Sequence, residues 1–165
     1  MMRSTICRAT LVGVMVALAG LAVAQTTGPA ESDNPYVVDF TKTLGKYSIA
    51  SAEGKHVPGE GVVLTDLKTT DGPMLEGEIA DISQTPIAVV EVENRGNKTL
   101  LLYFKVKSPV LRVRLLRVGV EPGKSTLRVD LRRAEIDLTR LNYVKLFGEG
   151  KADLVVKSIS FAKAE

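Results

Sequence analysis

The segment from Val120 to Phe161 constrains the fold more than any other stretch, because short strand-like runs alternate with turn signals along it. Glu121-Pro122-Gly123-Lys124 is a turn sequence. After this turn, apolar and polar residues alternate with the two-residue period of a strand that buries one face. The apolar positions are Leu127, Val129 and Leu131, and the polar positions are Arg128, Asp130 and Arg132. A short polar link, a strand, a turn and a last strand follow, which predicts the closing third of a β-sandwich.

Apolar residues elsewhere also come in short runs, bounded by Gly, Pro, Asn or Asp, without the three-and-four spacing of an amphipathic helix. We therefore predict an all-β fold, a two-sheet antiparallel β-sandwich (jelly roll) of about ten strands. The predicted strands are 36–40, 47–52, 61–67, 74–79, 87–93, 99–107, 111–118, 125–131, 143–147 and 153–161.

Three local features are predicted within this pattern. Residues 94–98 read as a hairpin loop, because Gly and Asn tolerate the left-handed backbone that such loops need. The turn at 121–124 reads as a second hairpin. In strand 111–118 the apolar phase slips at Leu115-Leu116, which predicts a β-bulge there and places Arg112 and Arg114 on the outward phase.

The first residues have the pattern of a secretory signal peptide, with Arg3 and Arg8 before an apolar run and Ala22-Val23-Ala24 at its end. We predict a signal peptide at 1–24, a flexible polar leader at 25–35 and one β-sandwich domain at 36–165. The protein is then secreted or periplasmic, with no membrane span after cleavage. The only cysteine, Cys7, precedes the cleavage motif, so the exported domain depends on its core rather than on disulfides.

Charge is distributed unevenly along the chain. Residues 25–104 contain twelve acidic and six basic residues, whereas 105–145 contain eleven basic and four acidic residues. One interpretation is that cross-strand ion pairs join the two halves. The other is that the basic strands form a surface for an anionic partner such as an acidic polysaccharide. We expect no nucleic-acid partner.

Catalytic and metal-binding motifs are weak. His56 is the only histidine and lies in a loop by composition, which argues against a histidine-based catalytic triad. Two pairs of carboxylates share strand faces, Glu76 with Glu78 and Glu91 with Glu93, and we do not assign them catalysis. Aspartates that could bind calcium have no regular spacing; they are Asp39, Asp66, Asp71 and Asp81. We predict a protein that is not an enzyme, with no catalytic residue, metal site or cofactor.

The residues from Glu121 onward resemble the C-terminal half of galactose-binding-domain-like jelly rolls, the β-sandwich of many secreted bacterial carbohydrate-binding modules. The matching elements are Pro122-Gly123, Asp130-Leu131, Asp137-Leu138-Thr139, Val144-Lys145-Leu146-Phe147 and the run from Leu154 to Phe161. Val38-Asp39-Phe40 is similar to the first strand of that family. Members usually carry an aspartate pair in the last strand near a structural calcium. This chain has Lys157-Ser158 there, and we expect the Lys157 ammonium to take the cation's electrostatic role.

The resemblance implies a non-catalytic carbohydrate-binding-like module of the bacterial envelope or exterior. Its sugar platforms would be outward-phase aromatics, for which Tyr103, Tyr143 and Phe147 are the candidates. The ligand-binding residues that we predict for an anionic glycan are Tyr103, Lys105, Arg112, Arg114, Arg128 and Tyr143. The alternative is a β-sandwich interaction scaffold whose basic strands meet an acidic protein partner.

Overall fold

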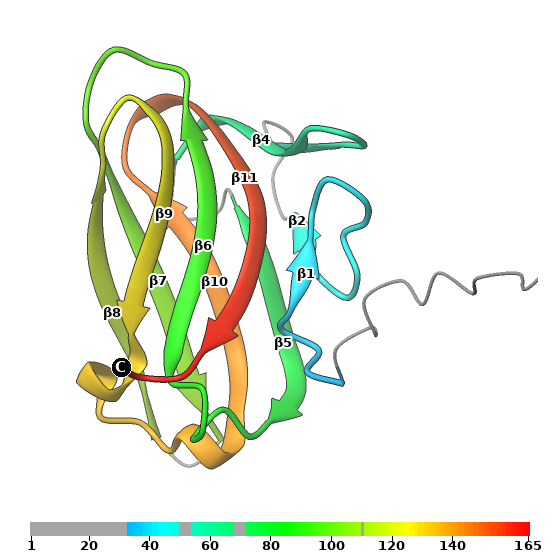
Figure 1. Cartoon of the computed structure of the whole chain (residues 1–165), viewed down its shortest axis with the longest axis vertical. Coiled ribbons are helices and arrows are strands. Elements are labelled where there is room, and N and C mark those ends of the chain that lie inside the picture. The colour runs from blue at the N-terminus through cyan, green and yellow to red at the C-terminus, as the bar shows by residue number, and fades with distance from the viewer. Residues whose placement is uncertain (1–32, 50–53, 68–71, 110) are drawn as a thin grey trace, which may run out of the picture. The chain divides into compact units, whose positions relative to one another are not determined.

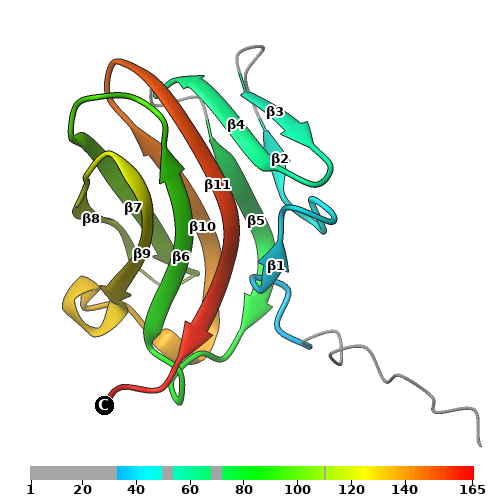
Figure 2. The same cartoon turned by 45° about the horizontal axis from the view of Figure 1, so that its top comes forward.

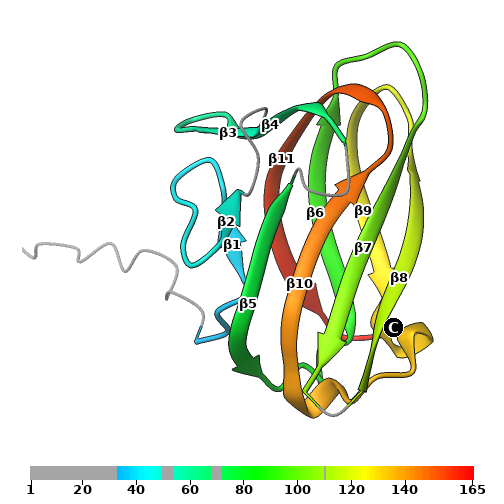
Figure 3. The same ribbon diagram turned by 180° about the vertical axis from the view of Figure 1, so that it is seen from behind.

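The computed structural model describes residues 33–49, 54–67, 72–109 and 111–165, and shows a two-sheet antiparallel β-sandwich. Sheet A has the strand order β3-β4-β11-β6-β9, with β1 also paired to β11. Sheet B has the order β2-β5-β10-β7-β8. Sheet A faces the viewer in Figure 1 and sheet B faces the viewer in Figure 3. The predicted fold class is therefore confirmed. The predicted signal peptide and most of the polar leader lie outside the described residues.

The described residues form eleven strands and two short 3-10 helices. The strands of sheet A are β1 (Val38–Asp39), β3 (Gly54–Val57), β4 (Gly61–Asp66), β6 (Ile87–Asn94), β9 (Gly123–Asp130) and β11 (Lys151–Ala162). The strands of sheet B are β2 (Ser48–Ile49), β5 (Pro73–Ala80), β7 (Leu100–Ser108), β8 (Leu111–Val120) and β10 (Leu141–Gly148). The helices η1 (Leu131–Ala134) and η2 (Leu138–Arg140) link β9 to β10. The sequence did not predict β3, which forms a hairpin with β4 that is visible in Figure 2.

The core lies between the sheets and follows the two-residue alternation of their strands. In sheet B the inward residues are Leu102, Phe104 and Val106 of β7 with Val144 and Leu146 of β10, all buried. In sheet A they are Val90 and Val92 of β6 with Leu154, Val156 and Ile159 of β11. Each such side chain gains about 1.5–3 kcal/mol on leaving water.

The segment that carries β1 and β2 adds three buried aromatic side chains to this core. The ring of Phe40 packs edge-on against that of Tyr47, with 5.2 Å between their centroids. The Tyr47 hydroxyl donates to the Tyr36 carbonyl at 3.0 Å, and the Tyr36 hydroxyl donates to the Glu78 carbonyl at 2.6 Å. Both hydroxyls therefore keep a hydrogen-bond partner, and burial raises the pKa of each tyrosine.

The two predicted hairpins are wrong, because each loop crosses from one sheet to the other. Among the described strands, β6 pairs with β11 and β9 in sheet A, whereas β7 pairs with β10 and β8 in sheet B. The turn at 121–124 likewise joins β8 of sheet B to β9 of sheet A. Asn94 connects the two crossing segments. Its buried amide donates to the Lys98 carbonyl at 2.8 Å in the first loop, and to the Val120 carbonyl at 3.1 Å just before the second.

The bulge predicted at Leu115-Leu116 is also wrong. Pairing of β7 with β8 runs without interruption from Leu100 opposite Val120 to Val106 opposite Arg114, and its register shifts only beyond that point. Leu115 is therefore on the outward phase and 50% exposed, and Arg114 is on the inward phase. Arg114 tolerates that phase because β8 is an edge strand, where its side chain reaches past the core to η1. There its Nε donates to the Ala134 carbonyl at 3.1 Å.

We expect Phe104→Ala to lower the free energy of unfolding by about 3–5 kcal/mol, because it leaves a cavity between the sheets. The Phe104 side chain is 1% exposed and lies at the centre of β7. Ile79→Ala is the matched control; Ile79 is 57% exposed, and we expect a change within about 0.5 kcal/mol. Urea unfolding followed by circular dichroism measures both values. Equal losses in the two variants would contradict this position of the core.

Candidate functional site

The outer face of sheet B gathers aromatic and cationic side chains in adjacent rows. Strand register places Phe147 of β10, Tyr103 of β7 and Arg117 of β8 side by side in one row. The next row contains Lys145 of β10 and Lys105 of β7, with Leu115 beyond them. Tyr143 occupies the row after that, between Glu76 of β5 and Lys107 of β7. We call this surface the ring-and-cation face; its members are Tyr103, Lys105, Arg117, Tyr143, Lys145 and Phe147.

Each ring of this face has a cation above it. The rings of Tyr103 and Phe147 stack with 5.2 Å between centroids and 18° between planes. The Arg117 guanidinium lies 5.5 Å from the Tyr103 centroid, and the Lys105 ammonium lies 5.4 Å from that of Tyr143. Lys145 lies 5.9 Å from the Phe147 centroid. Such contacts contribute roughly 0.5–1 kcal/mol each at exposed sites.

Polar atoms of the two tyrosines have partners at the border of the face. The Tyr103 hydroxyl donates to Oε1 of Glu149 at 2.9 Å, and this bond is the main reason that the pKa of Tyr103 is raised. The Tyr143 hydroxyl lies 3.3 Å from the sulfur of Met74. Lys107 reaches across the Tyr143 row to Glu76 at 3.8 Å. The hydroxyls are thus held in place, which orients both rings.

The rings are covered rather than open. Tyr103, Tyr143 and Phe147 are 6%, 7% and 8% exposed, although none belongs to the core between the sheets. Their cations and neighbours cover the ring faces. Because Lys145 is itself only 8% exposed, a sugar would first meet the Lys105 ammonium and the Arg117 guanidinium. Exposed apolar side chains border the face, with Leu101 on β7 and Val113 and Leu115 on β8.

The structure brings together three of the six residues predicted to bind ligand, Tyr103, Lys105 and Tyr143, on the ring-and-cation face. Arg114 lies on the inward phase of β8, with its guanidinium 3.7 Å from Glu135. Arg128 lies on β9 in sheet A, 3.4 Å from Glu165. The side chain of Arg112 lies outside the described part of the structure. The prediction missed Arg117 and Lys145, although both lie in the basic segment and alternate with apolar residues.

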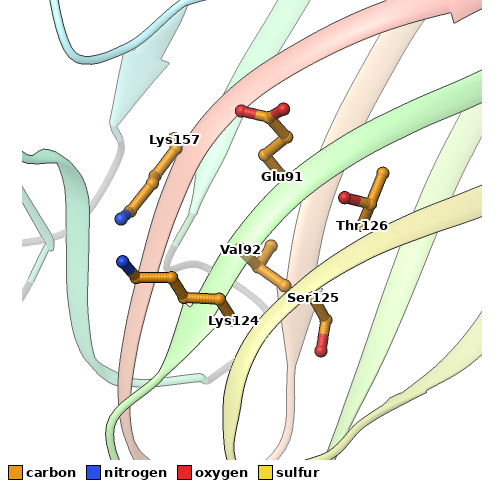
Figure 4. A pocket seen from close by; sticks show the side chains of 6 residues that line it. All are labelled: Glu91, Val92, Lys124, Ser125, Thr126 and Lys157. Carbon is orange, nitrogen blue, oxygen red and sulfur yellow. The ribbon is translucent and has the colours of Figure 1, made fainter.

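A groove of about 270 Å³ opens on the outer face of sheet A and contains the last-strand lysine. Figure 4 shows Lys157 of β11 and Lys124 of β9 extending their ammonium groups toward the same region, whereas the carboxylate of Glu91 on β6 points away from them. The Lys157 ammonium lies 2.7 Å from Oε2 of Glu93. It is thus paired with a carboxylate at the position where the resemblance places an aspartate pair. That it takes the calcium's electrostatic role stays a hypothesis.

The Lys157 contact lowers the pKa of Glu93. Its hydrogen bond is the largest cause, desolvation opposes it, and the charges of Lys157, Arg95 and Lys124 lower the pKa further. Arg95 lies 3.8 Å from Glu93 and also pairs with Glu60. Glu93 is therefore an anion surrounded by cations.

The other carboxylates considered from sequence have separate surroundings. Gly77, at φ +89°, stands between Glu76 and Glu78, where β5 changes register against β10. Glu76 contacts Lys107, and Glu78 accepts from Lys46 at 2.9 Å. Within the described ranges, no three His, Cys, Asp or Glu side chains are grouped to hold a metal ion, and Asp71 falls outside those ranges.

His56 is not the free loop residue that composition suggested. It lies on β3, and its Nε2 is 2.8 Å from the Phe40 carbonyl.

The uneven charge along the chain had two interpretations, ion pairs between the two halves or a surface for an anionic partner. The observed ion pairs match neither of them fully. Among the described pairs, only Lys107–Glu76 joins a base of 105–145 to an acid of 25–104. Arg114, Arg128 and Arg132 instead pair with acids that follow residue 104 in the chain. Lys105 and Arg117 contact aromatic rings. The ion pairs of Arg114, Arg128 and Arg132 therefore stay within the later part of the chain.

Comparison with known proteins identifies the fold. No protein-family model matches the chain, and no curated protein sequence does. The solved structure of PfGH50B is similar over 78% of this chain, with 16% identity and a TM-score of 0.61, and the match spans only 23% of PfGH50B. A family 11 carbohydrate-binding module from Clostridium thermocellum, in complex with a β-1,3-1,4-mixed-linked tetrasaccharide, is 12% identical. It covers 78% of this chain and 95% of its own, with a TM-score of 0.48. The likeness to PfGH50B supports the predicted β-sandwich fold.

We expect the Glu93 carboxyl to titrate below the usual glutamate range, and Lys157→Gln to return it toward that range. Because the pKa of Glu93 is lower in the folded than in the unfolded chain, the pair stabilises the protein above the unfolded pKa. That contribution is lost as pH falls through the folded pKa. Carboxyl-carbon NMR of the two proteins measures the titration. An unchanged Glu93 titration in Lys157→Gln would contradict the pairing.

Proposed function

We propose that this protein is a non-catalytic carbohydrate-binding module for an acidic polysaccharide. The observation that carries the proposal is the ring-and-cation face, where Lys105, Arg117 and Lys145 lie over the rings of Tyr143, Tyr103 and Phe147. Aromatic rings contact the apolar faces of sugars, and cations contact carboxylate or sulfate groups. A polysaccharide that carries both kinds of group complements the whole face.

Binding on this face exchanges one set of cation contacts for another. A carboxylate or sulfate that accepts from Lys105 draws the ammonium away from Tyr143 and uncovers a ring on which the sugar can lie. Charged hydrogen bonds contribute about 1.5–3 kcal/mol, which exceeds the roughly 0.5–1 kcal/mol of an exposed cation–ring contact. An acidic group adds an opposite charge to the hydrogen bond that it accepts, so the exchange favours an acidic glycan over a neutral one.

The surroundings of the carboxylates support a binding rather than a hydrolytic role. Glu76, Glu78 and Glu93 each contact a basic side chain. The contact with Lys157 lowers the pKa of Glu93, whereas a general acid in glycoside hydrolysis needs a raised pKa. PfGH50B, whose name denotes a glycoside hydrolase, shares the fold over less than a quarter of its length.

The proposed function also requires that the protein is exported. A signal peptide at 1–24 would deliver the domain to the periplasm or the exterior, where acidic polysaccharides occur. In the described ranges no helix has the length and apolar character of a membrane span. Fractionation of the native host, followed by N-terminal sequencing of the mature protein, tests this step.

An interaction scaffold is the second candidate, and exposed apolar side chains beside the cations favour it. Val113 and Leu115, on edge strand β8, are 46% and 50% exposed. They could contact an acidic protein partner along the border of the ring-and-cation face. A partner that co-purifies from the host and dissociates in high salt would support this function over glycan binding.

We expect the protein to bind polygalacturonate with an affinity that falls as salt rises, because screening weakens contacts between exposed charges. Lys105→Gln should weaken binding about tenfold or more, since it removes one charged hydrogen bond. Lys55→Gln is the matched control, because it removes an equal charge from an exposed position on β3. Isothermal titration calorimetry at two salt concentrations measures the affinities.

Two results would count against this function. One is that neither polygalacturonate nor a neutral β-glucan changes the melting temperature or the gel mobility of the protein. The other is that Lys105→Gln and Lys55→Gln weaken binding equally, which would indicate attraction to net charge rather than contact with the ring-and-cation face.

A further inference from the structure

The open side of the sandwich holds a second groove, between edge strand β8 of sheet B and edge strand β9 of sheet A. Its volume is about 520 Å³, which lies within the roughly 300–1,000 Å³ typical of ligand sites. Leu116, Val118 and Val129 form part of its apolar lining. In Figure 1 the two strands lie at the same side of the molecule. We call this hollow the edge groove.

Three arginines give the edge groove its charge. Arg117 comes from β8, Arg128 from β9 and Arg133 from η1. The one acid in the lining is Asp130, and Arg132 already holds it through two bonds, Nε to Oδ1 at 2.8 Å and Nη2 to Oδ2 at 2.7 Å. The groove therefore keeps an excess of positive charge.

The contacts that compete for the groove arginines are weak. Arg128 lies 3.4 Å from Glu165, whose side chain is 94% exposed, and exposed pairs of this kind contribute about 0–1 kcal/mol. Arg117 contacts the Tyr103 ring. An incoming carboxylate or sulfate can therefore replace these contacts at little cost. Guanidinium groups bind such anions through two parallel hydrogen bonds.

The edge groove continues into the ring-and-cation face, because Arg117 of β8 belongs to both surfaces and Leu115, which borders the face, also lines the groove. A glycan on that face can therefore run over β8 and place its next residue in the groove. We propose that the edge groove is a subsite for the anionic group of that polysaccharide, a carboxylate or sulfate held by Arg128 and Arg133. This inference rests on the proposed function and assigns the discrimination between acidic and neutral sugars to these two arginines.

An extended acidic peptide is the other occupant that the groove chemistry admits. It would pair along the free edge of β8 or β9 through its main chain. Such a strand would follow the edge and would not use the ring-and-cation face. The continuity of the two surfaces through Arg117 therefore favours the glycan.

The experiment compares two forms of one oligosaccharide, oligogalacturonate and its fully methyl-esterified form, which differ only in the carboxylate charge. Calorimetry measures the affinity of both forms for the full chain and for the double variant Arg128→Gln/Arg133→Gln. We expect wild type to prefer the charged form, and the double variant to lose about tenfold or more of that preference while binding the ester as before. Arg133→Gln alone should lose part of it.

A second double variant controls for net charge. Lys55→Gln/Arg140→Gln removes two exposed positive charges from β3 and η2, outside the groove, and should keep the preference. Circular dichroism and melting temperature compare the folding of all variants.

Three results would overturn the subsite. If Arg128→Gln/Arg133→Gln keeps the full preference while Lys105→Gln weakens binding, the subsite is wrong and the proposed function stands. If poly-glutamate binds wild type more tightly than oligogalacturonate and loses affinity in the groove variant, the edge groove is a peptide site. If wild type binds neither form of the oligosaccharide, the proposed function fails and the subsite fails with it.

Discussion

The alternation of side chains along β7 and β10 is the constraint on which both the core and the outer face depend. Leu102, Phe104 and Val106 point between the sheets and are buried, so the backbone of β7 cannot shift by one residue without exposing them. The same register fixes Tyr103 and Lys105 on the opposite side. The ring-and-cation face is therefore fixed in place by the packing of the core between the sheets.

The sequence was sufficient to predict where most strands lie, but it was insufficient to predict which sheet each strand joins. Alternation predicted ten of the eleven strands, and β3 escaped because Gly54-Lys55-His56-Val57 contains too few apolar residues. The loop at 94–98 has the composition of a hairpin and yet crosses between sheets. Composition indicates that the chain turns, whereas the crossing between the sheets is stabilised by the buried Asn94 amide, which donates to the Val120 carbonyl. Asn94 and Val120 are 26 residues apart, so the residues around Asn94 give no sign of this contact in the sequence.

The residues of the candidate site likewise fall into those that the sequence could predict and those that it could not. The outward direction of Tyr103 and Tyr143 follows from parity within each strand, so both were predicted. Their partners depend on register between strands about forty residues apart, as with Phe147 opposite Tyr103. Arg114 was assigned to the wrong phase because an edge strand lets a long side chain leave the core sideways, which interior strands do not allow. Single-strand patterns therefore predicted the outward direction of the two tyrosines, but not the residues that lie beside them and not the direction of Arg114.

The lysine in the last strand gives sheet A a cation that belongs to the chain. Lys157 reaches Glu93 from the neighbouring strand, with Lys124 and Arg95 close by. A bound metal ion leaves when its free concentration falls or when a chelator competes for it. The Lys157 ammonium is covalently part of every molecule, so the strength of its contact with Glu93 depends on pH and ionic strength instead. In a compartment where divalent ions are scarce, the Lys157 ammonium would still balance the charge of Glu93, and no bound metal ion would be needed.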